Sequence, residues 1–164
     1  MIFGMDALTF IHVLISLIGI VSGFVVLAGM FDSRRLESWT ALFLITTVAT
    51  SATGFLFPFT KLLPSHIVGI ISLVVLVIAL VARYAFRLKD SWRWIYVVTA
   101  LAALYLNTFV LVAQAFLKVP ALKALAPTGS EPPFLVAQAV VLVFFIYVGA
   151  RAAMRYRPET MVAI

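Results

Sequence analysis

The side chains of this chain that could bind a ligand in an apolar environment are few and uncharged. Six of them lie within or beside long apolar runs, namely His12, Thr53, His66, Asn107, Gln114 and Gln138. Imidazole, amide and hydroxyl groups recognise small molecules through hydrogen bonds, and imidazole can also ligate haem iron. We therefore treat these six as candidate ligand-binding residues.

The sequence shows no catalytic equipment. It has no cysteine and no phosphate-binding loop, dinucleotide-binding, zinc-protease or nucleophile-elbow motif. Ser65 and His66 are adjacent but have no matching carboxylate at membrane depth, and the chain does not evidently supply the third and fourth ligands that zinc would require. We predict no catalytic residue and no metal site, and we expect a non-enzymatic protein.

The composition indicates that lipid surrounds the elements that position these residues. Hydrophobic residues make up 65% of the chain and charged residues 11%, whereas soluble domains hold about 45–50% and about 25%. The apolar runs are about 20 residues long, the length that crosses a hydrocarbon layer ~30 Å thick. We predict an all-α integral membrane protein, a single domain over 1–164, built as a bundle of five transmembrane helices at about 7–30, 38–57, 65–86, 94–117 and 134–154.

The longest connection, loop 118–133, carries four prolines and Gly129, which prevent a long helix. Pro120 favours the first position of a short helix over 120–126, which we expect to lie on the membrane surface.

The basic residues predict the orientation of the helices. Nine of them fall on one side of the predicted membrane, namely Arg34, Arg35, Arg83, Arg87, Lys89, Arg93, Arg151, Arg155 and Arg157. Three fall on the other, namely Lys61, Lys118 and Lys123. Cytoplasmic loops carry an excess of Lys and Arg, so we expect the N-terminus outside the cytoplasm and the C-terminus inside it. The net charge of +6 then reflects topology, and we expect no nucleic-acid partner.

The predicted topology places five of the candidate residues at similar depth near the outer surface, namely His12, Thr53, His66, Gln114 and Gln138. Asn107 lies two turns deeper than Gln114 on the same predicted helix face. One interpretation is an outer pocket for a small apolar or amphipathic ligand, and the other is a structural layer of interhelical hydrogen bonds. No charged residue lies in the middle of a predicted helix, which argues against an ion pump.

Three functions stay open on this evidence. The protein either holds a small ligand in its outer half, acts as an accessory subunit of a larger membrane complex, or is a redox protein that binds haem b or quinone through His12 and His66. The G-x-x-x-G pair Gly19 and Gly23 predicts a close helix contact, either with the helix at 38–57 or across a homo-oligomer.

Three stretches of the chain, Thr53–Phe59, Leu63–Leu73 and Lys118–Thr128, resemble those of small multi-pass inner-membrane proteins of proteobacteria that have no assigned function. The resemblance covers most of the chain and implies the bacterial inner membrane, but it carries no activity and no functional residue. The chain is also similar in size and span count to the tryptophan-rich sensory and translocator family, which binds porphyrins and sterols, although it has three Trp and no matching motif.

Overall fold

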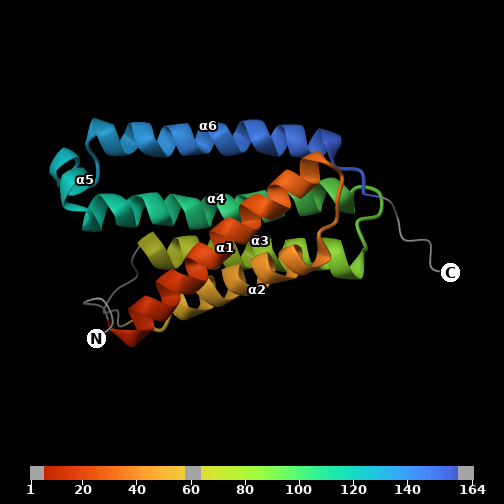
Figure 1. Cartoon of the computed structure of the whole chain (residues 1–164), viewed down its shortest axis with the longest axis horizontal. Coiled ribbons are helices and arrows are strands. Elements are labelled where there is room, and N and C mark those ends of the chain that lie inside the picture. The colour runs from red at the N-terminus through yellow and green to blue at the C-terminus, as the bar shows by residue number, and fades with distance from the viewer. Residues whose placement is uncertain (1–5, 58–63, 159–164) are drawn as a thin grey trace.

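The computed structural model describes residues 6–57 and 64–158, and in this part of the chain the regular elements are all helices, without a strand. Its elements are α1 (Ala7–Phe31), α2 (Glu37–Gly54), α3 (Pro64–Leu80) with its π-helical continuation η1 (Val81–Ala85), α4 (Trp92–Lys118), α5 (Pro120–Leu125) and α6 (Pro132–Arg155). The long helices lie side by side as a bundle (Figure 1). The predicted all-α class is confirmed.

Four of the described helices are long and apolar enough to cross a membrane. They cover Ala7–Phe31, His66–Ala85, Trp92–Lys118 and Pro132–Arg155. The remaining long helix, α2, is richer in threonine, and the hydroxyls of Thr46, Thr47 and Thr50 each donate to the carbonyl four residues earlier. These bonds satisfy the hydroxyl groups within α2, so the hydroxyls need no partner on another helix when α2 is buried.

One helix boundary differs from the sequence prediction, and one short helix is found where it was expected. The helix expected at 38–57 ends at Gly54, because Phe55 and Leu56 form tighter bonds to the carbonyls of Ala52 and Thr53, three residues earlier. This turn folds the Phe55 ring back against α3. The short helix expected after Pro120 is present as α5, with proline in its first turn.

The glycine pair on α1 serves packing within the chain. A Cβ at Gly23 would lie 2.6 Å from Leu104 Cδ1 and 3.0 Å from the Phe43 ring, and a Cβ at Gly19 would lie 3.1 Å from Thr47 Oγ1. Only glycine admits this approach of α1 to α2 and α4. The expected contact between the first two helices is therefore confirmed.

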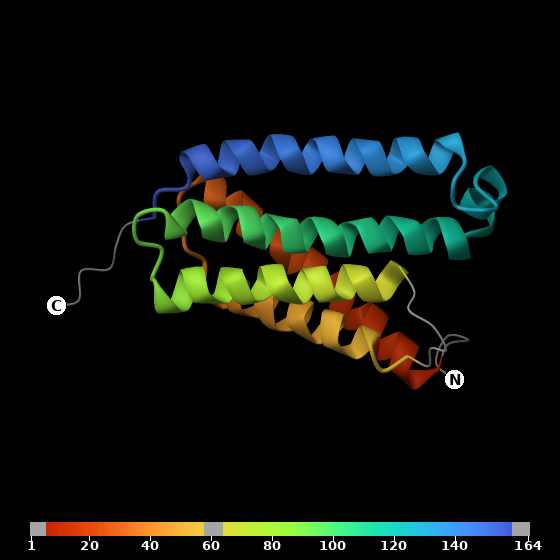
Figure 2. The ribbon, with the colours of Figure 1, turned by 180° about the vertical axis from the view of Figure 1, so that it is seen from behind.

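Helix α4 lies at the centre of the arrangement, with α3 and α6 beside it and α1 crossing it diagonally (Figures 1 and 2). Because of this crossing, α1 and α4 diverge towards the end of the bundle that carries α5, which we call the α5 end. The loops 32–36 and 86–91 and residues 156–158 meet at the other end, which we call the basic end. There the Ser33 hydroxyl donates to the carbonyl of Arg155 (3.1 Å) and accepts from the N–H of Arg157 (3.0 Å).

Candidate functional site

A partly open cavity of about 100 Å³ lies between α1, α2, α3 and α4, towards the α5 end of the bundle. Each of the four helices contributes polar side chains to its wall, namely His12, Ser16, Thr50, Ser51, His66, Ser72 and Asn107. Gly54 and Gly69 also line it, and their lack of side chains leaves space beside the ring of His12 and the ring of Phe55, respectively. We call this space the histidine cavity. It contains three of the six residues singled out from the sequence.

A fourth predicted residue, Thr53, fixes the ring of His12. His12 Nδ1 lies 2.9 Å from Thr53 Oγ1, and the same hydroxyl lies 2.7 Å from the carbonyl of Ala49. A hydroxyl has one proton to donate, and here it goes to the nearer carbonyl, so His12 Nδ1–H donates to Thr53. His12 is then the Nδ1-protonated tautomer, and Nε2 is left as the hydrogen-bond acceptor of the ring. Phe57 supports the ring edge-on at 5.2 Å.

Asn107 is buried at the inner end of the cavity, where it joins α4 to α1. Ser16 Oγ donates to Asn107 Oδ1 (2.9 Å), and Asn107 Nδ2 lies 3.5 Å from the Ser16 carbonyl. Gly19 lies one turn further along α1, and a Cβ there would come within 3.4 Å of Asn107 Nδ2. The glycine therefore leaves room for the amide between the two helices.

His66 faces the cavity from the first turn of α3 and is 5% exposed. Its ring stacks on Phe55 at 5.8 Å, so the turn that ends α2 covers the histidine of α3. Deeper along the same seam, Ser51 Oγ donates to Ser72 Oγ (3.0 Å). These contacts make α2 and α3 one wall of the cavity and α1 and α4 the other.

The two glutamines are not brought into this group. Gln138 is buried on α6, where its Nε2 donates to the carbonyl of Phe109 on α4 (3.1 Å), and Gln114 is exposed on α4. Gln114 is on the same predicted face as Asn107, but α1 has diverged from α4 at this level (Figure 2). The neighbour that covers Asn107 is therefore no longer beside Gln114.

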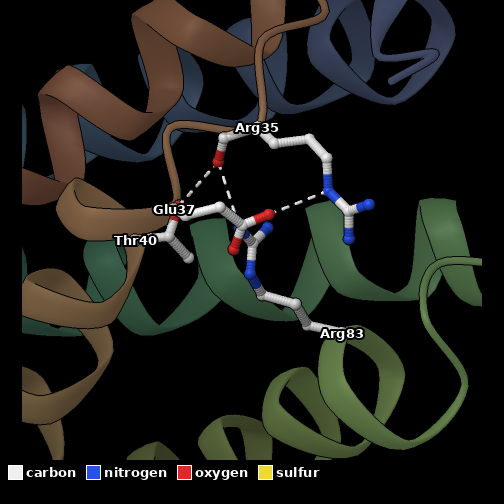
Figure 3. A network of polar contacts seen from close by, with 4 residues as sticks. All are labelled: Arg35, Glu37, Thr40 and Arg83. Carbon is white, nitrogen blue, oxygen red and sulfur yellow. Dashed lines mark hydrogen bonds and ion pairs between the residues drawn. The ribbon is translucent and has the colours of Figure 1, made fainter. Parts of the chain in front are cut away.

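A charged network near the basic end was not singled out from the sequence (Figure 3). Arg83 lies in η1, inside one of the candidate membrane spans, and is 2% exposed. Its Nη2 donates to Glu37 Oε2 (2.8 Å) and to the carbonyl of Arg35 (3.1 Å), while Arg35 Nε pairs with Glu37 Oε1 (3.0 Å). The carbonyl of Arg35 also accepts from Thr40 Oγ1 (3.1 Å).

This network joins the end of α3 to the start of α2. The guanidinium of Arg83 also lies over the ring of Tyr96 at 5.2 Å, so it contacts α4 as well. The charge count placed Arg83 among the basic residues on one side of the predicted membrane, and the structure buries it within the bundle. The signal available in the sequence was a single arginine near the end of an otherwise apolar run, with Glu37 as the one acidic residue of α2.

Imidazole, hydroxyl and amide side chains are the polar groups that line the histidine cavity. Among the described residues, no group of three or more His, Cys, Asp or Glu side chains could hold a metal ion. The described residues thus form an all-helical protein with four membrane-capable helices and a small cavity, lined in part by polar side chains, between α1, α2, α3 and α4. No protein-family model, curated protein sequence or solved structure matches the chain.

Proposed function

We propose that this protein is a multi-pass protein of the bacterial inner membrane that holds a small amphipathic molecule in the histidine cavity, without catalysing a reaction, either alone or as an accessory subunit of a membrane complex. The observation that carries the proposal is the convergence of His12, His66 and Asn107 on one partly open cavity. His12 uses Nδ1 for its bond with Thr53, so its Nε2 can bind a further partner, and a ligand in the cavity can supply that partner.

The size of the cavity limits the ligand. Benzene fits an engineered protein cavity of about 150 Å³, and the histidine cavity measures about 100 Å³. It therefore suits a polar head of several heavy atoms, with the apolar remainder of the molecule outside the opening. His12 Nε2 is the acceptor of its ring, so we expect the head group to carry a donor such as a hydroxyl.

The proposed topology has five membrane-spanning helices, with the N-terminus outside and the basic end in the cytoplasm. Helix α2 joins the basic end at Glu37 to the α5 end at Gly54 and runs antiparallel to α1 (Figure 1). If α1 crosses the membrane, α2 crosses it as well. The concentration of Arg and Lys at the basic end supports the orientation.

A reporter fused after Ile164 should be active only in the cytoplasm, and periplasmic activity would reject both the orientation and the span count.

A variant that fills the cavity tests the ligand proposal. Ser72 is 5% exposed and lines the cavity, so Ser72→Leu should occupy the space that the ligand head needs. Val74→Leu is the matched control, because Val74 is 55% exposed on the same helix. Organic extracts of the purified proteins should contain one compound, enriched over bulk lipid, in the wild type and the control but not in Ser72→Leu. Equal amounts in all three, or no enriched compound, would reject the proposal.

A redox role is the second candidate, because the two histidines of the chain line the same cavity. Of the two cofactors considered, the ring of a quinone suits a cavity of this size better than the much larger porphyrin of haem b. A bound quinone would exchange electrons and protons with the membrane pool. The visible spectrum and a quinone assay on the same extract separate the cases: a Soret band indicates haem, an enriched quinone supports the redox role, and a different compound supports simple ligand binding.

A further inference from the structure

The basic end carries a second cavity, separate from the histidine cavity, with the opposite electrostatic character. Its volume is about 530 Å³, and five cationic side chains line it, namely Arg35, Arg87, Lys89, Arg93 and Arg157. Asp90 is the one acidic residue in its wall. The cations come from the loop after α1, the loop before α4, the first turn of α4 and the segment after α6. We call this space the basic cavity.

Among residues 6–57 and 64–158, the cations around the basic cavity outnumber the acidic side chains that pair with them. The ion pairs found among residues 6–57 and 64–158 both use Glu37, which binds Arg35 and the buried Arg83. Arg87, Lys89 and Arg157 form no ion pair in this part of the chain. Like charges that converge without counter-charges repel one another, and a bound anion removes that repulsion.

The loop that supplies two of these cations is held in one conformation. Arg87, Leu88 and Asp90 all adopt positive φ angles, of 51°, 61° and 47°, which is unfavourable for residues other than glycine. Buried Leu88 anchors the loop, and its N–H donates to the carbonyl of Ala82 (3.0 Å). Backbone strain of this kind persists only where surrounding contacts enforce it, so the loop presents its charges in a fixed arrangement.

An aromatic stack and hydrogen bonds to backbone carbonyls hold the rest of the wall of the basic cavity in place. The rings of Phe86 and Trp92 stack at 3.9 Å and close the base of the loop. Arg93 Nη1 donates to the carbonyls of Ala153 and Tyr156, which ties the start of α4 to the end of α6. The first turn of α4 has no acidic residue, so the positive end of the helix dipole adds to the field in the cavity.

We propose that the basic cavity binds a phosphate group. Phosphate offers several oxygens to several donors at once. The planar guanidinium group of arginine can donate two parallel hydrogen bonds to phosphate oxygens, which it cannot do to a monatomic anion. The cavity lies where the membrane-capable helices end, which is the depth of lipid head groups. A phospholipid head group and a soluble phosphate ester share this chemistry, and the experiment below distinguishes these two sources. The site is independent of any ligand in the histidine cavity.

The test uses the purified full-length protein in a neutral detergent. One arm measures binding of phosphatidylglycerol, with phosphatidylcholine for comparison, by native mass spectrometry and thermal melting. The other arm replaces chloride by inorganic phosphate at constant ionic strength. The double variant Arg87→Gln/Lys89→Gln removes two cavity charges, and Arg34→Gln/Arg151→Gln removes two exposed charges outside the cavity.

We expect the cavity variant to weaken binding of the phosphate probe about tenfold or more, and the control variant to change it by less than about threefold. An effect of phosphatidylglycerol alone identifies a lipid head group, and an effect of inorganic phosphate identifies a soluble ligand. Arg157→Gln, which alters the segment after α6 and leaves the strained loop intact, repeats the measurement if the double variant does not fold. Equal binding by cavity and control variants, or no preference for phosphate over chloride and phosphatidylcholine, overturns the proposal.

Discussion

The bond between Ser16 and Asn107 gives the sharpest test of how the histidine cavity is built. The Ser16 hydroxyl donates to the Asn107 amide oxygen at 2.9 Å across the α1–α4 contact. The reverse contact, from Asn107 Nδ2 to the Ser16 carbonyl, is 3.5 Å long and contributes little. The perturbation is a double-mutant cycle of Ser16→Ala, Asn107→Ala and the pair together.

The expected magnitude follows from these contacts. Interhelical polar bonds in membrane proteins contribute about 0.6 kcal/mol on average and at most about 1.7 kcal/mol. One short bond between two part-buried groups therefore predicts a coupling energy of about 1 kcal/mol. Asn107 is 7% exposed, so Asn107→Ala also loses packing, and we expect it to lower the free energy of unfolding by about 2 kcal/mol. Ser16→Ala should lower it by about 1 kcal/mol, and the double variant by about 2 kcal/mol instead of 3.

The free energy of unfolding is measured by titrating the purified protein with a denaturing detergent and following helix content by circular dichroism. Thr108→Ala is the matched control, because Thr108 neighbours Asn107 but its hydroxyl donates within α4, to the carbonyl of Leu104 (2.8 Å). We expect the control to change stability by less than about 0.5 kcal/mol. Strictly additive single variants would refute the interhelical bond, and with it the proposed inner end of the cavity.

Three further outcomes are expected. Gly23→Leu should lower the melting temperature in detergent, because even a Cβ at this position would lie 2.6 Å from Leu104 Cδ1. An unchanged melting temperature would reject the close packing of α1 against α2 and α4. Glu37→Gln should lower the free energy of unfolding by about 1–2 kcal/mol, since it leaves the buried Arg83 without its half-exposed counter-ion. Adding Arg83→Met to this variant should recover part of the loss. A double variant less stable than Glu37→Gln would contradict the reasoning. Hydrogen bonds from Thr128 lower the pKa of Glu131 from 4.5 to about 2. The stabilisation that these bonds give the α5–α6 connection should therefore be complete above pH 4.5 and disappear as the pH falls through 2. A carbon NMR titration of Glu131 with its midpoint at the ordinary value would show that these bonds do not form.

The elements that the sequence predicts well are those that depend on local physics. Apolar runs of membrane length mark the long helices, and Pro120 marks α5, because both signals act within one segment. Depth along a helix is also readable, since the rise per residue is fixed. His12, Thr53, His66 and Asn107 lie close together in the fold for that reason, although ligand binding by them stays a prediction.

The features that the sequence does not predict depend on how helices cross. Depth says how far Gln114 lies from the end of α4, but not that α1 has diverged from α4 at that level. Likewise, Gln138 has a predicted depth similar to that of His12, yet it is on α6, which is not part of the cavity wall. Arg83 reads as a loop charge until the fold places Glu37 beside it. Crossing angles and pairings between distant segments come from packing, which no local pattern records.

The π-helical turn at the end of α3 also constrains how the length of this chain can vary. In η1 the N–H of Phe86 bonds the carbonyl of Val81, five residues earlier instead of four, so the turn holds one more residue than an α-helix would. Deleting a single residue within η1 would remove the residue that the wider turn accommodates and give a regular α-helical turn. The bond from the Leu88 N–H to the carbonyl of Ala82, which anchors the loop 86–91, spans this turn and would be lost. Single-residue deletions between Ala82 and Leu88 should therefore displace the loop that carries Arg87 and Lys89 from the basic cavity.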